Sequence, residues 1–432
     1  MAAGRLTAWR SLALAVGILS AGAADAEPAP VQPVAAWVQL IDGGVAEARA
    51  VVEGSACPDA EIDGQRRPMR VRAAPDPAAF PQTVCSLVLP KETRTARIGG
   101  RMLPPPPAAD INRIVVMGDT GCRVHDHKVQ ACNDPRAWPF AAVMRRAAAE
   151  KPDLVIHVGD YYYRETACPA DYVGCADTPH GDIWPSWQAD FFDPAQPLLA
   201  AAPWLFARGN HESCNRGGKG WDRLLEAAPL PTRCSLGSPV FSVPLGGGVA
   251  IHVLDSADAE DRVATPAGLA YVEHQLTALP HGAATHDDWV LTHRPFWGEA
   301  PAFGLGPLGV FNVGINRTEQ LAARGKDLSA VSLILSGHIH HFASFDFGDA
   351  RPAQLVVGTG GDLGETFDPA KVQAGEVYID GLEAQTLTFQ QYGYFVMERG
   401  PTGWSGLFKD LDGKLVARCT LVGRALTCAA AK

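Results

Sequence analysis

The chain has 432 residues, of which 47% are hydrophobic and 19% are charged, a balance typical of a globular protein and not of a disordered one. Its formal net charge of −10 provides no broad basic surface, so we expect no nucleic-acid partner. The length allows two or three domains, or one large domain with a small one.

The first 26 residues have the pattern of an export signal. Arg5 and Arg10 supply positive charge, residues 11–24 form a short apolar stretch, and Ala24-Asp25-Ala26 resembles a cleavage site. The apolar stretch is too short to span a membrane comfortably, which disfavours the alternative of an uncleaved anchor. We therefore expect a mature chain from Glu27 that is periplasmic or extracellular, without stable membrane insertion.

Residues 36–103 consist of short strand-like runs, such as AEARAVVEG and TVCSLVL, separated by charged residues and by Gly or Pro. They contain no convincing helix. Four consecutive prolines follow at 104–107 and form a stiff segment. We therefore predict a small all-β N-terminal domain with a Pro-rich linker at 27–107, and a larger domain at 108–432.

From residue 108 onward, apolar strands alternate with helical patterns. The predicted strands end in polar residues, as in INRIVVMGD, LVIHVGD, PWLFARGNHE, VAIHVLDS, DDWVLTHRP, AVSLILSGHIHH and QLVVGTGGD. Helices are predicted at 139–150 and 268–279, and residues 393–428 return to strands. This alternation predicts an α/β domain with substantial parallel pairing.

Ten cysteines agree with an exported protein, because disulfides are the default in an oxidising compartment. They fall into five pairs that are close in sequence, and the hypothesis is that these pairs are bonded: 57/85, 122/132, 168/175, 214/234 and 419/428. A zinc site is the alternative, and the absence of any C-x2-C pair argues against it.

The polar residues that could carry chemistry lie at the carboxyl ends of the predicted strands, where α/β sheets gather ligand and catalytic groups. They are Asp119, Asp160, Asn210, His211, His293, His338 and His340. Carboxylate, amide oxygen and imidazole are metal ligands of intermediate hardness. One such residue is usually part of a turn, but this many in one α/β segment indicate a metal site.

Five motifs then reveal a resemblance: GD at 118–119, GDxxY at 159–163, GNHE at 209–212, LTH at 291–293 and GHIH at 337–340. Over about residues 114–362 the chain resembles the calcineurin-like metallophosphoesterases, in particular their purple acid phosphatase branch. The resemblance implies a sandwich of two β-sheets flanked by helices. It also implies two metal ions bridged by Asp160.

By the same resemblance, Asp119, Tyr163 and His340 would complete the first metal site, and Asn210, His293 and His338 the second. His211 would be the general acid. Many family members have a histidine two residues after the first aspartate, where this chain has Gly121. The purple branch lacks that histidine and uses the tyrosine of GDxxY. Tyr163 therefore becomes the predicted ligand, suited to Fe3+, with Fe2+, Zn2+ or Mn2+ at the second site.

The resemblance implies an exported phosphatase that hydrolyses phosphomonoesters by attack of a metal-bound hydroxide. One alternative is a phosphodiesterase acting on nucleotides or phospholipid head groups at the same site. Another is a non-catalytic surface or binding protein. Arg164 and Arg294 adjoin the motifs and are candidates either for phosphate binding or for structural ion pairs. The usual aromatic-Glu-Arg element after the last motif is missing, so the substrate residues are less defined than the metal ligands.

Overall fold

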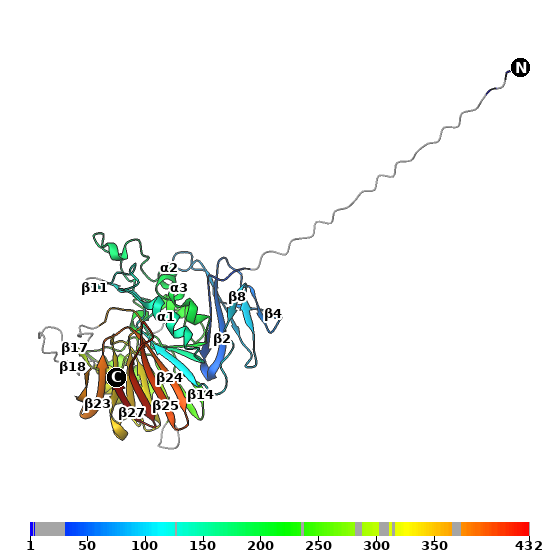
Figure 1. Ribbon diagram of the computed structural model, residues 1–432. Helices are drawn as coiled ribbons and strands as arrows, with labels where there is room; N and C mark the ends of the chain where they lie inside the picture. The colour runs from blue at the N-terminus through cyan, green and yellow to red at the C-terminus, as the bar shows by residue number, and fades with distance from the viewer. Residues whose placement is uncertain are drawn as a thin grey trace. The chain divides into compact units, whose positions relative to one another are not determined.

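Strands from most of the chain collect in two large β-sheets in the computed structural model (Figure 1). The structure describes residues 1, 2, 4, 31–125, 128–234, 237–280, 287–301, 311, 312, 316–364 and 373–431. The predicted export signal at 1–26 lies almost wholly outside these residues. Within the described ranges, no helix has the length and apolar character needed to cross a bilayer.

The first sheet has eleven strands in the order β27-β26-β25-β24-β9-β12-β13-β1-β2-β6-β5. Strands β9, β12, β13 and β1 are parallel, and the flanking strands are antiparallel. The strands are β1 (Ala35–Ile41), β2 (Val45–Val52), β5 (Arg70–Ala73), β6 (Thr83–Val88), β9 (Arg113–Met117), β12 (Leu154–His157), β13 (Trp204–Phe206), β24 (Gly393–Gly400), β25 (Gly403–Asp410), β26 (Leu415–Val422) and β27 (Ala425–Ala430).

The second sheet has eight strands in the order β14-β15-β16-β19-β21-β20-β23-β22, with β15, β16, β19 and β21 parallel. Its strands are β14 (Phe241–Gly246), β15 (Val249–Val253), β16 (Asp288–Leu291), β19 (Val331–Ser336), β20 (Phe342–Asp346), β21 (Ala353–Val357), β22 (Gln373–Ile379) and β23 (Leu382–Phe389).

The remaining strands form three small sheets. One has four strands, β3 (Asp59–Ile62), β4 (Gln65–Pro68), β7 (Ala96–Ile98) and β8 (Arg101–Leu103). The other two are hairpins, β10 (Val124–His125) with β11 (Lys128–Val129) and β17 (Ala300–Pro301) with β18 (Phe311–Asn312).

The central strands are buried on both faces, which explains their nearly continuous apolar sequences. In β9, Ile114 and Val116 belong to the core between the two sheets, whereas Val115 and Met117 belong to the core on the outer face of the first sheet. A third core covers the outer face of the second sheet. The period of two along each strand thus fills one inner and one outer core at the same time.

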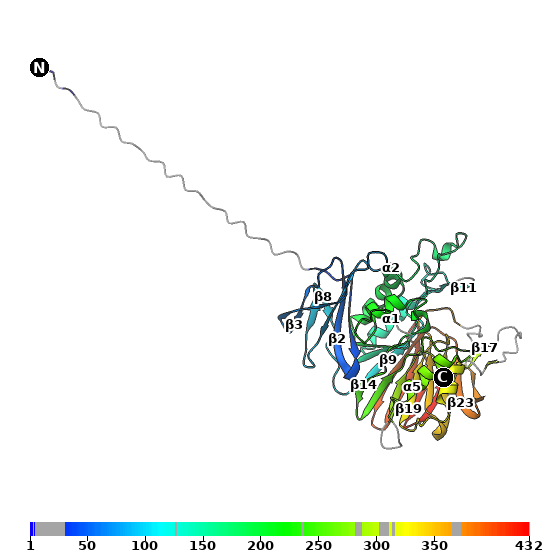
Figure 2. The same cartoon turned by 180° about the vertical axis from the view of Figure 1, so that it is seen from behind.

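Helices cover both outer faces. On the first sheet these are α1 (Phe140–Ala149), α2 (Trp184–Trp187), a π-helical turn (Gln188–Phe192), α3 (Asp193–Leu199) and α4 (Gly218–Leu224). On the second sheet they are α5 (Pro266–Leu276), seen against β19 in Figure 2, and α6 (Arg317–Ala323). The fold is therefore the predicted sandwich of two sheets flanked by helices.

The structure differs from the prediction at the boundary placed at 107/108. Strand β1 pairs in parallel with β13, with Gln39 opposite Trp204, so the first sheet continues across the proline segment. The physical reason is that β1 is apolar and buried on both faces, which a strand at the edge of a small separate sheet would not be. Residues 31–432 accordingly pack as one unit.

The five disulfides join the cysteine pairs predicted from their spacing: Cys57–Cys85, Cys122–Cys132, Cys168–Cys175, Cys214–Cys234 and Cys419–Cys428. The last pair joins directly opposite residues of the antiparallel strands β26 and β27. Every cysteine is in a disulfide, which rules out the zinc site considered as the alternative.

One carboxyl group in the outer core of the second sheet stands out. Glu319, in the first turn of α6, is fully buried, and neither of its carboxylate oxygens has a hydrogen-bond partner among the described residues. Burial raises the pKa of Glu319 to about 8, although Arg294 acts in the opposite direction. The folded protein therefore holds a proton that the unfolded chain releases near pH 4.5.

We expect Glu319→Gln to stabilise the protein above about pH 5. The raised pKa in the folded state means that stability is lost as pH rises from about 4.5 to about 8, by up to about 1.4 kcal/mol per pH unit. The neutral amide removes this loss. Thermal unfolding at pH 5 and pH 8 should show a smaller decrease for the variant than for the wild type. Glu273→Gln on α5 is the control, and equal decreases in all three proteins would contradict the expectation.

Candidate metal centre

The predicted ligands follow the ends of five strands, three adjacent parallel strands of the first sheet and two of the second. In the first sheet, Asp119 follows β9, Asp160 follows β12 and Asn210 follows β13. In the second, His293 follows β16, and His338 and His340 follow β19, while residues 358–363 after β21 close the site from one side. Because the carboxyl ends of parallel strands lie at the same edge, both sheets deliver their polar residues to one place.

Four side chains form the first group. The Tyr163 hydroxyl is 2.8 Å from Asp160 Oδ2, 3.2 Å from Asp119 Oδ1 and 3.2 Å from His340 Nε2. One ligand atom each from Asp119, Asp160 and His340 lies within 4.8 Å of the others, which is close enough to hold one metal ion. The structure thus brings together all four residues predicted for the first metal.

Asp160 also belongs to the second group. Asn210 Oδ1 is 2.9 Å from His293 Nε2 and 2.8 Å from His338 Nδ1, and His293 Nε2 is 3.1 Å from Asp160 Oδ2. Asp160, His293 and His338 offer ligand atoms within 4.8 Å of one another. One carboxylate is therefore shared between two sets of ligands, as a bridge between two metals requires.

The three imidazoles are oriented from behind. His293 Nδ1 is 2.8 Å from the Val158 carbonyl oxygen, and His340 Nδ1 is 2.7 Å from the Leu363 carbonyl oxygen. His338 Nε2 is 3.0 Å from Asp261 Oδ1. The carbonyl contacts of His293 and His340 keep a proton on the outer nitrogen and direct the lone pair of the inner nitrogen into the cluster, which is how metal-binding histidines are held. The outer nitrogen of His338 lies between Asp261 and Arg294 Nη1, each at 3.0 Å.

The electrostatics of the cluster also fit cations. Asp119 and Asp160 are at most 1% exposed. Against the effect of burial, Asp160 raises the pKa of His293 to about 9, and Asp362 and Asp119 raise that of His340 to about 9. The buried carboxylates thus attract positive charge strongly. Carboxylates, imidazoles, an amide oxygen and a phenol form a donor set that suits divalent and trivalent metals, so the residues fit a two-metal site.

Three ligands sit on strained backbone. Asp119, Asp160 and His338 have φ angles of 56°, 59° and 70°, in the left-handed region that residues other than glycine rarely adopt. Such strain costs about 1–3 kcal/mol at each position and persists only where the surroundings enforce it. The loops after β9, β12 and β19 therefore place these side chains in the cluster at the cost of an unfavourable backbone conformation.

Glu212, the last residue of GNHE, ties the loop after β13, in which it lies, to the loop after β12. Its Oε2 accepts hydrogen bonds from the backbone N–H of Asp160 and of Gly209, both at 3.0 Å. Its Oε1 accepts from the N–H of Tyr161 at 2.9 Å and of Tyr162 at 3.2 Å. The sequence analysis assigned no role to Glu212, although it lies inside a motif that was singled out.

Asp190 plays a similar part beside Tyr163. It lies on the π-helical turn after α2 and accepts hydrogen bonds from the backbone N–H of Cys122 at 3.1 Å and of Tyr163 at 2.8 Å. Arg164 Nε also binds it, at 2.6 Å. No sequence motif marked Asp190, because it is separated from both partners by more than 25 residues.

Arg164 and Arg294 were predicted either to bind phosphate or to form ion pairs, and the structure gives both of them the ion pair. Arg164 pairs with Asp190, and Arg294 pairs with Asp261, the residue that orients His338. Their side chains are only 4% and 9% exposed. Their contacts hold the loops of the ligands in place, so the phosphate-binding role has no support here.

The three consecutive tyrosines have separate environments. Tyr161 donates a 2.7 Å hydrogen bond to the Ala207 carbonyl and stacks on His157, with 4.0 Å between ring centroids. Tyr162 stacks on Trp187 at 5.8 Å. Both belong to the core on the outer face of the first sheet, and only the third tyrosine of the run lies in the ligand cluster.

Gly121 and Tyr163 are matched to each other. A Cβ atom at position 121 would lie 2.7 Å from Tyr163 Cδ2, 2.8 Å from the Tyr161 carbonyl oxygen and 2.9 Å from Tyr163 N. These distances are shorter than real contacts, and two of the three atoms belong to the backbone. A side chain at 121 therefore collides with the Tyr163 ring and with the backbone of residues 161–163, so this position of the tyrosine loop requires glycine at 121.

His211, predicted as general acid, lies on a 3-10 turn (Asn210–Glu212) directly beside the cluster. Its ring packs on Tyr163 with 3.7 Å between centroids, and its Nε2 is 3.9 Å from Asp160 Oδ2. Burial lowers the pKa of His211 to about 4, with Asp160 acting in the opposite direction. The imidazole is therefore neutral at pH 7.

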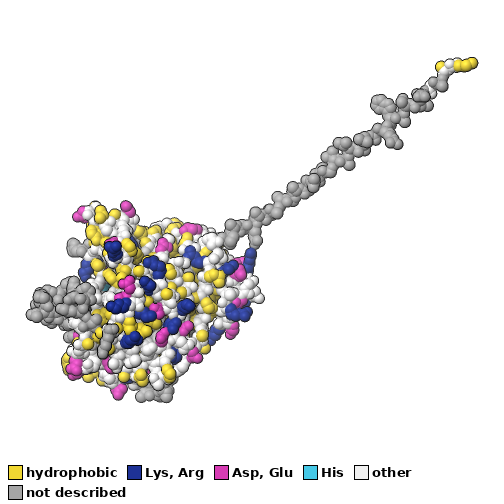
Figure 3. Space-filling view, in the orientation of Figure 1, with side chains coloured by type: hydrophobic (Ala, Val, Ile, Leu, Met, Phe, Trp, Pro, Cys, Tyr) yellow, Lys and Arg dark blue, Asp and Glu magenta, His cyan; other side chains and the backbone are white. Residues whose placement is uncertain are grey.

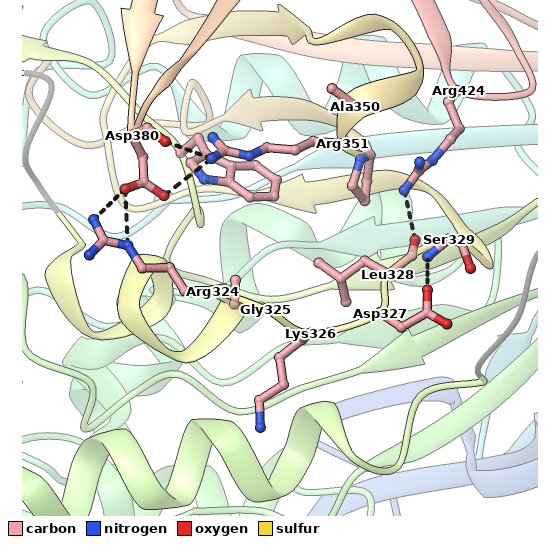
Figure 4. A pocket seen from close by; sticks show the side chains of 13 residues that line it. Arg324, Gly325, Lys326, Asp327, Leu328, Ser329, Ala350, Arg351, Asp380 and Arg424 are labelled. Carbon is pink, nitrogen blue, oxygen red and sulfur yellow. Dashed lines mark hydrogen bonds and ion pairs between the residues drawn. The ribbon is translucent and has the colours of Figure 1, made fainter.

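A cavity of about 420 Å³ lies elsewhere, beside the end of α6 (Figure 4). Arg424 donates there to three backbone carbonyls, those of Leu328, Val331 and Asp349. Arg324 and Arg351 both bind the carboxylate of Asp380. These arginines fasten loops to one another, and the cavity shares no residue with the ligand cluster.

Comparisons with known proteins agree with this geometry. The sequence profile of the calcineurin-like phosphoesterase family matches residues 112–342. A search of curated proteins finds no match. The purple acid phosphatase PPD1 from yellow lupin (Lupinus luteus) seeds is similar over 93% of this chain and 74% of its own, with a TM-score of 0.57 and 14% identity. A structure of PhoD is similar over 94% of this chain and 93% of its own, with a TM-score of 0.52 and 12% identity. At these identities the likeness concerns the fold.

We expect Gly121→Ala to displace Tyr163 and to lower both stability and metal content. The added methyl group has no space against the backbone of residues 161–163, so the tyrosine loop must shift. A cost of about 1–3 kcal/mol is typical of such overpacking. Thermal unfolding and metal analysis of the purified protein would measure both effects.

Gly375→Ala on β22 is the matched control, because nothing lies within 4 Å of a Cβ atom there. A Gly121→Ala variant with the metal content and melting temperature of this control would contradict the reciprocal packing.

Proposed function

This chain belongs to the calcineurin-like phosphoesterase family, and we propose that within it the chain is an exported, purple-type acid phosphatase that hydrolyses phosphomonoesters. The observation that carries this proposal is the contact of the Tyr163 hydroxyl with Asp119, Asp160 and His340, made possible by Gly121. The donor set of this group resembles that of the purple branch and not that of members with a histidine after the first aspartate.

Seven residues would hold two metal ions: Asp119, Tyr163 and His340 the first, Asn210, His293 and His338 the second, and Asp160 both. When bound, the metal pair neutralises the charge of a phosphate ester and lowers the pKa of water. Tyr163 favours Fe3+ at the first site, because a phenolate is a hard anionic oxygen ligand, and Fe2+, Zn2+ or Mn2+ would suit the second.

His211 is placed to serve the leaving group. Its Nε2 lies 3.9 Å from the shared carboxylate, at the edge of the cluster, and its ring is held by Tyr163 on one side. It can give a proton to a departing alkoxide only from its protonated form, and burial, which lowers its pKa to about 4, restricts that form to acidic solution.

The disulfides and the surface of the protein support an exported enzyme with a small substrate. Five disulfides are typical of proteins in oxidising compartments, which agrees with export to the periplasm or beyond. On the face drawn in Figure 3, basic and acidic side chains are interspersed with hydrophobic ones and do not form a continuous basic field. A small phosphorylated molecule fits this surface better than a polynucleotide does.

We expect the metal-loaded protein to hydrolyse p-nitrophenyl phosphate with a higher kcat/KM than bis(p-nitrophenyl) phosphate. Asn210→Ala should lower kcat/KM for the monoester by about 100-fold or more, since even residues behind metal ligands cost 10–100-fold. Asn112→Ala, at an exposed position, is the control. A preference for the diester would favour the phosphodiesterase alternative. Less than one metal per chain and no activity after reconstitution would favour a binding protein.

We expect the iron-loaded protein to absorb visible light through charge transfer from the Tyr163 phenolate to Fe3+. Tyr163→Phe removes the phenolate oxygen and should abolish the band. Tyr162→Phe is the matched control, because Tyr162 packs on Trp187 away from the cluster and should leave the band in place. A colourless iron-loaded wild type, or a band that survives Tyr163→Phe, would refute the assignment of this ligand.

A further inference from the structure

A group of four polar side chains, His125, Glu165, His211 and Arg216, lies at the rim of the metal centre and is called the rim cluster here. Glu165 is its hub. Its Oε1 is 2.6 Å from His211 Nδ1 and 2.7 Å from Arg216 Nε, and its Oε2 is 3.0 Å from His125 Nδ1. One oxygen of the carboxylate, Oε1, thus holds both the predicted general acid and the guanidinium in fixed relation, while Oε2 holds His125.

Arg216 places the positively charged guanidinium of the rim cluster next to the predicted general acid, His211. Its Nη2 is 2.7 Å from His211 Nδ1 and 2.9 Å from His211 Nε2, and the latter atom faces Asp160. The imidazole ring of His211 therefore lies between the guanidinium of Arg216 and the carboxylate of Asp160. Its side chain is 27% exposed, compared with 4% for Arg164 and 9% for Arg294.

Arg216 also has hydrogen-bonding capacity to spare. A guanidinium carries five N–H donors. Nε and Nη2 are engaged with Glu165 and His211, whereas Nη1 donates to no residue that the structure describes. Two N–H groups thus remain for a ligand. Arg123, which lies over the Tyr163 ring at 4.8 Å, is in a different position, because Asp362 binds both its Nε and its Nη2.

We propose that Arg216 binds a non-bridging oxygen of the substrate phosphate and thereby makes the site selective for monoesters over diesters. This inference rests on the proposed function and adds the residue that sets the substrate class. A phosphomonoester carries close to two negative charges near neutral pH, and a diester carries one with its second oxygen esterified. Arginine is always charged and presents a planar set of donors, so it binds the additional negative oxygen of a monoester more strongly than the esterified oxygen of a diester.

Glu165 acts as a positioning residue in this arrangement. Without it, the guanidinium and the His211 ring would have no common partner, and the cation would be free to turn toward solvent. The carboxylate neutralises part of the charge of Arg216, yet its hydrogen bonds go to Nε and Nη2 and leave the Nη1 donors for the phosphate. The rim cluster therefore combines a fixed orientation with an available donor pair.

The test uses the metal-loaded protein and the variants Arg216→Gln and Arg216→Lys. Removing a charge-assisted hydrogen bond costs a factor of about 10–100. For Arg216→Gln we expect kcat/KM to fall by about that factor on p-nitrophenyl phosphate, and by less than about 3-fold on bis(p-nitrophenyl) phosphate. Arg216→Lys keeps the charge and should lie between. Arg145→Gln, an exposed position on α1, is the control and should match the wild type on both esters.

Titration calorimetry with inorganic phosphate and with dimethyl phosphate gives a second readout that does not depend on turnover. Arg216→Gln should weaken phosphate binding by about 10-fold or more and leave dimethyl phosphate binding unchanged. Equal losses of affinity for inorganic phosphate and dimethyl phosphate, or an unchanged affinity for inorganic phosphate, would overturn the inference. If the wild type hydrolyses neither ester, the proposed function fails, and the phosphate titration still decides the role of Arg216.

Discussion

The shared carboxylate of Asp160 is the constraint on which the rest of the structure depends. It accepts hydrogen bonds from the Tyr163 hydroxyl at 2.8 Å and from the His211 backbone N–H at 2.9 Å, and it lies 3.1 Å from His293 Nε2. Those partners come from both sheets, so the sandwich can form this contact only if the parallel strands of each sheet end at the same edge. The apolar side chains packed between the two sheets fix that alignment. The left-handed backbone at Asp160 directs its side chain toward the ligands of both sheets.

Sterics, and not affinity alone, decide which side chain completes the first group. Gly121 leaves room for the ring of Tyr163, and a larger residue at 121 would meet the backbone of the tyrosine loop. That loop is held in turn by Asp190, which also binds the backbone of Cys122 next to the glycine. The two positions are thus one structural unit. A histidine at 121 would therefore require the whole tyrosine loop to move, and not only the side chain of Tyr163.

The parts of the site that the sequence predicts are those with a local signature. Apolar runs ending in Gly-Asp, Gly-Asn-His or Gly-His identify strand and ligand together, and closely spaced cysteines identify the disulfides. Asp190, Asp261 and Glu165 lack such a signature, because each reaches its partners across loops whose course only the folded chain defines. The position of β1 was missed for a related reason: its apolar sequence predicts a buried strand but does not say which sheet buries it.

The supporting carboxylates show how the site is organised before any cation arrives. Glu212 and Asp190 accept hydrogen bonds from the backbone amides of the ligand loops and leave the ligand side chains free. A loop tied through its backbone keeps its shape whether the side chains are protonated, bound to metal or exchanged. Since every buried N–H must find an acceptor, these carboxylates also satisfy amides that the strained turns remove from the sheets. The same hydrogen bonds therefore stabilise the turns and preorganise the ligands, and metal binding need not bring the loops together.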